Sequence, residues 1–173
     1  MDPLKFPIGP FSIRETNRPR AERIEDIRNF PEQIKNLIEP LQPEGLHYTY
    51  RPGGWTIQQL IHHCADSHMN AVIRFKLALT EDQPTILPYR QSAWAELYDT
   101  QKVDIWWSVR LLEGLHKRWT ALLENMTEAE FSRTYIHPEH AHSIFTLDEA
   151  TAQYSWHCRH HLAHLQLAIN QNS

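Results

Sequence analysis

The spacing of apolar residues along the chain predicts four long helices. Apolar side chains recur every three or four residues from near Arg18–Glu22 to about Leu41, and again over about 57–80, 105–125 and 147–170. This is the period of a helix with one buried face. Pro31 lies inside the first segment, so we expect a kink or a break there. The pattern predicts an all-α fold, a four-helix bundle.

Turn and capping signals delimit these helices. Thr56 with Gln59, and Thr146 with Glu149, form capping boxes that mark the starts of the second and fourth helices. Asp104 is suited to cap the third.

The remaining segments are shorter. Residues 1–18 contain three prolines and are expected to form an extended arm on the surface. A short helix is expected over Gln91–Tyr98 within the connection 81–103, and a brief turn near Phe131. Thr134–Phe145 is the only stretch with strand-like or irregular character. With no internal repeat, residues 1–173 are expected to form a single domain.

Composition narrows the class of protein. With 41% hydrophobic residues and only 5 glycines, the chain does not resemble a loop-rich β domain. Its net charge of −4, without a run of Lys or Arg, argues against nucleic acid as a partner. No window approaches the roughly 18 apolar residues of a membrane span, and no signal peptide is recognisable. We therefore expect a cytoplasmic protein without a membrane partner, with Cys64 and Cys158 reduced.

The apolar stripes predict which side chains point inward. In the third helix the stripe runs through Trp107, Leu111, Leu115, Trp119, Leu122 and Met126. In the last helix it runs from Ala150 through Tyr154, His157, His161, His164 and Ala168. Three histidines thus occupy positions that a bundle normally gives to Leu or Ile, whereas His160 falls off the stripe and is expected to be a spectator.

Histidine is the anomaly of the composition, with 12 residues in the chain. His157 and His161 lie four residues apart, as do His160 and His164, so the Cβ atoms of each pair are roughly 5–6 Å apart on a helix. Burying imidazoles side by side leaves acceptors unsatisfied, and one divalent cation satisfies them together. The last helix therefore predicts a metal site.

A second helix must contribute a ligand, and periodicity leaves His63 and His68 both open. His68 continues the apolar stripe, while His63 heads a polar line and has Asp66 one turn on to orient it or a bound solvent. Cys64 and Cys158 point about 100° away from the neighbouring histidines and are disfavoured as ligands. A group of loop histidines, namely His137, His140 and His142, is more simply explained as solvated.

Several motifs resemble those of the YfiT group of the DinB superfamily. They are Pro7-Ile8-Gly9, Tyr50-Arg51-x-Gly53-Gly54-Trp55-Thr56, His62-His63-x-Ala65-Asp66-Ser67-His68-Met69-Asn70, Leu115-His116-x-Arg118-Trp119, His137-Pro138 and Trp156-His157-x-x-His160-His161-x-Ala163-His164. They occur in order over nearly the whole chain. The resemblance implies a DinB-like bundle, commonly a homodimer, with one divalent ion, zinc or nickel, between helices two and four. It implies His63, His157 and His161 as the metal ligands, which favours His63 over His68.

Three imidazoles leave a zinc ion at least one open coordination position, which is typical of catalytic sites. The resemblance implies either of two activities. In a thiol S-transferase of the bacillithiol type, the metal binds a low-molecular-weight thiol as its thiolate, which attacks an electrophile. In a metal-dependent hydrolase, metal-bound hydroxide attacks an ester or amide. The alternative is a non-catalytic stress protein that stores or senses the ion. The sequence identifies neither a general base nor the substrate.

Overall fold

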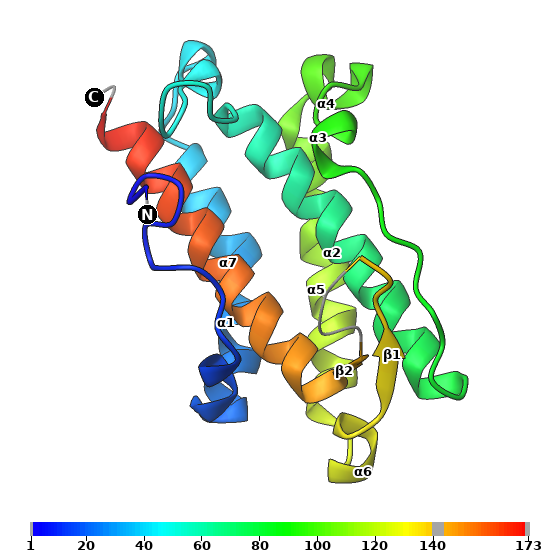
Figure 1. The fold of residues 1–173 in the computed structure, drawn as a ribbon. Coiled ribbons are helices and arrows are strands. Elements are labelled where there is room, and N and C mark those ends of the chain that lie inside the picture. Colours follow the sequence, from blue (N-terminus) through cyan, green and yellow to red (C-terminus); the bar gives the residue numbers. More distant parts are fainter. Residues whose placement is uncertain (1, 140–143, 172–173) are drawn as a thin grey trace.

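The computed structural model describes residues 2–139 and 144–171, in which four long helices pack side by side (Figure 1). They are α1 (Arg20–Ile38), α2 (Ile57–Thr80), α5 (Ile105–Glu124) and α7 (Leu147–Asn170). Both α1 and α2 pack against α5 and α7, so the two helices that come first in the sequence lie on one diagonal of the bundle. This arrangement confirms the predicted four-helix bundle and makes α2 and α7 neighbours.

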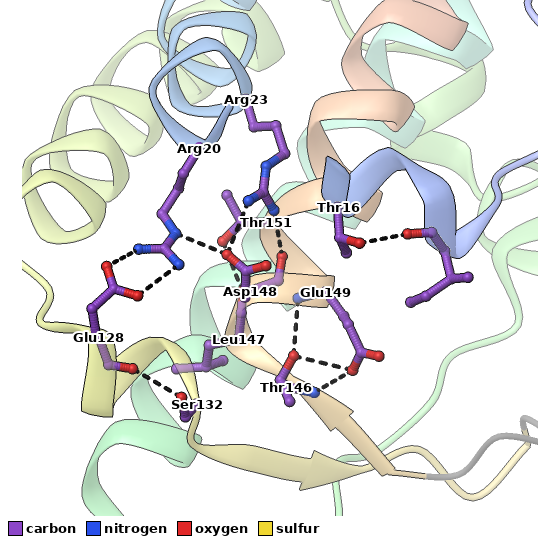
Figure 2. Close-up of polar contacts among 11 residues, drawn as sticks. Thr16, Arg20, Arg23, Glu128, Ser132, Thr146, Leu147, Asp148, Glu149 and Thr151 are labelled. Atoms are coloured by element: carbon purple, nitrogen blue, oxygen red, sulfur yellow. Dashed lines mark hydrogen bonds and ion pairs between the residues drawn. The ribbon is translucent and has the colours of Figure 1, made fainter. Parts of the chain in front are cut away.

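The predicted capping boxes fix the starts of α2 and α7. Thr56 Oγ1 accepts from the Gln59 N–H at 3.1 Å, and Gln59 Oε1 accepts from the Thr56 N–H at 3.0 Å. Thr146 and Glu149 repeat this exchange at the start of α7 (Figure 2). Each box satisfies two N–H groups that a helix start leaves free, so both predicted boundaries are confirmed.

A cluster of charges ties the start of α7 to α1. Arg23 donates to both the carboxylate and the main-chain oxygen of Asp148, at 3.0 and 2.9 Å. Arg20 donates from Nε to the same carboxylate at 2.8 Å and also pairs with Glu128 (Figure 2). Because two guanidinium groups share one half-buried carboxylate, the pKa of Asp148 is lowered despite its burial.

Pro31 lies within α1, which continues through it as one helix. Of the expected kink or break, the break is therefore excluded. Ile27, Phe30 and Ile34, on both sides of Pro31, are fully buried, and α1 packs against α5 and α7. A proline still removes one intrahelical hydrogen bond, and the carbonyl that it frees belongs to Ile27.

The predicted apolar stripe of α5 is wrong at its first two positions, whereas Trp119 is fully buried as predicted. Trp107 and Leu111 are 62% and 41% exposed. The buried face instead carries Ile105, Val109, Leu112, His116, Trp119, Thr120 and Leu123. This face includes His116, which a stripe drawn through apolar residues alone does not contain.

The shorter elements complete the chain. They are η1 (Ile13–Asn17), η2 (Pro43–His47), α3 (Gln91–Trp94), α4 (Tyr98–Lys102), α6 (Glu128–Phe131) and the antiparallel strands β1 (Thr134–Ile136) and β2 (Ile144–Thr146). The single helix expected over Gln91–Tyr98 is two separate turns. Gln59 and Gln101 each donate a side-chain N–H to the Ala95 carbonyl at 3.1 Å, which takes the place of a continuing helical bond.

The N-terminal arm lies along α7, as Figure 1 shows. Trp156 Nε1 donates to the Gly9 carbonyl at 3.1 Å, and Arg159 pairs with Glu15. The arm is thus a surface segment, as predicted, but it includes the 3-10 turn η1. Within the described residues, no helix is both long and apolar enough to cross a bilayer.

Candidate metal centre

His63, His157 and His161 meet where α2 packs against α7. Their ring centroids are 5.4 Å apart for His63 and His157, 5.0 Å for His63 and His161, and 4.3 Å for His157 and His161. One nitrogen from each ring lies within 4.8 Å of the other two. His63 and His161 are buried, whereas His157 is half-buried. The structure thus brings together the three histidines that the resemblance implied.

All three imidazoles are neutral near pH 7. Burial, together with the charge that His164 would carry when protonated, lowers the pKa of His63 to about 4. Burial likewise lowers the pKa values of His157 and His161 well below the usual range, and neighbouring histidines add to the effect. A neutral imidazole has a free lone pair, so these rings are in the form that binds a cation.

A chain of hydrogen bonds fixes the orientation of His157. His116 Nδ1 donates to the Ile27 carbonyl at 2.5 Å, which leaves His116 Nε2 as an acceptor. That nitrogen lies 2.7 Å from His68 Nδ1, and His68 Nε2 lies 3.0 Å from His157 Nδ1. A neutral imidazole has one donor and one acceptor. His68 therefore donates from Nδ1 to His116 and accepts at Nε2 from His157. His157 donates from Nδ1, and its Nε2 keeps a free lone pair.

The anchor of this chain depends on Pro31. In an uninterrupted helix the Ile27 carbonyl would accept from the N–H of residue 31, but proline has no N–H. The carbonyl is buried with Ile27 on the core face of α1, where His116 of α5 reaches it. Pro31 thus removes one hydrogen bond from α1 and leaves the Ile27 carbonyl free to accept from His116. That bond orients His116, and through it His68 and His157.

His161 is oriented by a second, shorter chain. His164 Nε2 donates to the Lys5 carbonyl at 3.1 Å, so its Nδ1 is an acceptor. His161 Nδ1 lies 3.4 Å from that atom and donates to it, which again leaves Nε2 free. A histidine that binds a metal usually donates its other ring N–H in this way.

The donor set fits a divalent ion such as zinc. With Zn–N bonds of 2.0–2.1 Å, tetrahedral ligand nitrogens are about 3.3 Å apart, within the 4.8 Å that encloses these three. The ligand atoms of His157 and His161 are defined by their hydrogen-bond chains, and His63 is held against the Trp55 ring at a centroid distance of 4.7 Å. Three such nitrogens could hold an ion and would leave room for a further ligand.

A second group of histidines, His160, His161 and His164, also has ring nitrogens within 4.8 Å of one another. His160 was expected to be a spectator off the core stripe, yet it is only 6% exposed, as is His161. Trp156 stacks on its ring at 4.4 Å, and Phe6 of the arm stacks at 5.9 Å. The periodicity of α7 could not show that the N-terminal arm covers His160.

A cavity of about 500 Å³, here called the histidine cavity, opens beside the triad. Its described lining includes the aromatic residues Trp55 and Trp156 and the basic residues Lys5 and Arg51, but no Asp or Glu. A metal bound there would face an apolar wall and positive charge.

Other sequence candidates lie elsewhere. Asp66, expected beside His63, has no hydrogen bond to that ring in the described chain, and desolvation raises its pKa to about 6. Cys64 and Cys158 are buried free thiols whose pKa values are raised by burial. His137 is buried and lines a separate cavity, while His140 and His142 lie outside the described residues.

Comparisons with known proteins show the family to which the chain belongs. The family model described as the DinB superfamily matches residues 27–165. The chain belongs to the DinB superfamily. YfiT of Bacillus subtilis, which carries the provisional name of metal-dependent hydrolase, is 43% identical over 164 residues, covering 94% of this chain and 92% of YfiT. A similarly named Oceanobacillus iheyensis protein is 45% identical over 163 residues, covering 93% of each chain.

The fold comparison reaches the same relative. A solved structure of Bacillus subtilis YfiT, described as a probable metal-dependent hydrolase with an unusual four-helix bundle topology, matches with a TM-score of 0.92. The identity is 42%, and the match covers 98% of both chains. The diagonal placement of α1 and α2 is thus part of an architecture shared with this DinB relative.

Proposed function

We propose that the protein is an enzyme that uses one divalent ion, zinc or nickel, held by His63, His157 and His161. The observation that carries the proposal is the hydrogen bonding behind the triad. Two of the three rings, His157 and His161, donate Nδ1–H to buried histidines, and one ring nitrogen of each of the three rings lies within 4.8 Å of the other two. Metal sites are built in this way, with oriented ligands and an open side.

Thiol S-transfer is the reaction that the histidine cavity supports best. An ion with an open position would lower the pKa of a bound thiol or water. The described lining has no carboxylate to act as the general base that many metal-dependent hydrolases use. A thiol needs less help, because its ordinary pKa is already about 8.5. Lys5 and Arg51 favour an anion, and Trp55 and Trp156 offer an apolar surface to an electrophile.

Hydrolysis of an ester or amide is the second candidate, and the names of the relatives favour it. The three histidines would serve it in the same way. A role in storing or sensing the ion without catalysis is the remaining alternative.

Metal content in single variants tests the assignment of ligands. His63→Ala and His157→Ala each remove a member of the proposed triad only, whereas His160→Ala removes a member of the second group only. We expect about one equivalent of bound zinc in wild type and in His160→Ala, and far less in the other two. Loss in His160→Ala alone would instead place the ion on the second group. His161→Ala does not discriminate, because His161 belongs to both.

The reaction is tested with the zinc-loaded protein. Monochlorobimane is incubated with and without a small thiol, and ester hydrolysis is followed separately. In the first assay a sulfur–carbon bond forms, chloride leaves with the electron pair of the carbon–chlorine bond, and the thiol proton goes to solvent. Thiol-dependent turnover that His157→Ala abolishes is the expected result. Ester turnover without thiol-dependent turnover would select the hydrolase. If neither activity is detected, storage or sensing of the ion is the remaining role.

A further inference from the structure

A second cavity of about 410 Å³, here called the arginine cavity, adjoins the histidine cavity. Gln91, Ser92 and His157 line both, so the half-buried His157 faces two adjacent cavities. The second space extends along α2 and α7 away from Lys5 and Arg51. Its described lining includes Arg74 and Arg90 as cations and Glu139 as the one acidic residue.

Arg74 lacks an acidic partner in the described chain. Other arginines, namely Arg18, Arg20, Arg23, Arg28 and Arg159, each form an ion pair with Asp or Glu. The one hydrogen bond of the Arg74 side chain in the described structure is a long one, 3.5 Å from Nη1 to Tyr154 Oη. Its Nε is buried and has no partner. A guanidinium with a buried donor that has no partner is costly unless an anion reaches it.

The position of Arg74 relates its head group to the metal triad. Tyr154 Oη, which Arg74 contacts, donates to the Ser67 carbonyl at 3.4 Å. Ser67 follows His63 by four residues on α2, an axial rise of about 6 Å. Tyr154 likewise precedes His157 by almost one turn of α7. The guanidinium therefore reaches back to within about one or two helical turns of the triad, a distance that a small molecule can span.

We propose that Arg74 binds the carboxylate of a small-molecule ligand whose reacting group reaches the metal at His157. This inference rests on the proposed function and narrows its substrate class. Arginine matches a carboxylate with two parallel N–H donors. The exposed Arg90 adds positive charge at the same cavity, and Glu139 leaves the described lining at a net charge of +1, which suits a singly charged anion better than a dianion.

The test uses two thiols that differ only in charge. N-(3-mercaptopropionyl)glycine has a carboxylate several bonds from its sulfur, and its glycinamide analogue has none. Binding of each to zinc-loaded protein is measured by isothermal titration calorimetry. We expect wild type to bind the carboxylate form about 10-fold to 100-fold more tightly, the range for a charged hydrogen bond. Arg74→Gln should abolish the difference, and Arg74→Lys should keep part of it.

Arg118→Gln is the matched control, because Arg118 is an exposed arginine on α5 and the variant changes net charge equally. It should retain the full preference. Equal binding of the two thiols by wild type, or an unchanged preference in Arg74→Gln, would overturn the proposal. Displacement of the carboxylate thiol by inorganic phosphate at lower concentrations than by acetate would also overturn it, in favour of a phosphate site.

The outcomes separate this proposal from the proposed function. The protein could prefer the carboxylate thiol through Arg74 and yet turn over neither thiol nor ester. That result would support the carboxylate site and refute the proposed enzyme activity. Turnover of both thiols without any preference would do the reverse. Zinc content and circular dichroism of each variant show whether the triad and the fold are intact.

Discussion

Replacing His68 tests whether the buried histidine chain prepares the metal centre. His68 has no exposed surface, and its two nitrogens serve different neighbours. Asparagine places a polar atom near the position of Nδ1, and glutamine places one near that of Nε2. His68→Asn can therefore keep the contact to His116 while it loses the acceptor for His157. His68→Gln keeps that acceptor and loses the contact to His116.

The two variants should differ in metal affinity but not in stability. Removing a group that orients a metal ligand typically costs 10-fold to 100-fold in affinity, or about 1.4–2.8 kcal/mol. We expect that loss in His68→Asn and a loss of less than about tenfold in His68→Gln. Each variant leaves one buried polar group unpaired, so the free energy of unfolding of the metal-free protein should fall by about 1–3 kcal/mol in both.

Zinc affinity is measured by competition with a chromophoric chelator, and stability by urea unfolding. His47→Asn, at an exposed histidine, controls for the loss of an imidazole. Equal zinc affinity in the two His68 variants, or weaker binding by His68→Gln, would refute the orientation of His157 through His68.

Three further predictions follow from buried groups. Pro31→Ala restores an intrahelical hydrogen bond, so the free energy of unfolding should rise by up to about 3 kcal/mol. The restored N–H competes with His116 for the Ile27 carbonyl, so zinc affinity in the chelator competition should fall. Unchanged zinc affinity would exclude a role for this carbonyl. The metal-free protein should lose stability in urea as the pH falls from 6.5 toward 4. Burial lowers the pKa values of His63 and His116 to about 4, so the unfolded chain binds more protons in that window. Each such histidine lowers the free energy of unfolding by up to about 1.4 kcal/mol per pH unit, and a pH-independent stability would contradict their burial. Cys64 and Cys158, buried with raised pKa values, should react with a disulfide reagent only after unfolding, and rapid reaction of the native protein would count against their placement.

Local signals in the sequence predicted most of the helices. The capping boxes at Thr56 and Thr146 placed the starts of α2 and α7 correctly, because they depend on residues three apart in the chain. The apolar stripe of α7 placed His161 and His164 inside. The resemblance to the YfiT group selected His63, where periodicity left His68 open.

The missed features depend on contacts between distant segments. His116 was overlooked because the stripe of α5 was drawn through Trp107 and Leu111, although Val109, Leu112, His116 and Trp119 have helical spacing too. The burial of His160 depends on Phe6, more than 150 positions earlier in the sequence. No periodicity within one helix reports such contacts, and none showed that a proline in α1 supplies the acceptor for a histidine in α5.

The bond from His164 to the Lys5 carbonyl joins residues 159 positions apart, and it has a consequence for biosynthesis. A growing chain makes the arm first, yet the arm has no helix to lie on until α7 has emerged. His63 must likewise await His157 and His161. Closing such long loops is slow compared with forming a helix, so the centre is among the last parts to assemble. A nascent chain that stops before α7 therefore has no triad that could capture an ion.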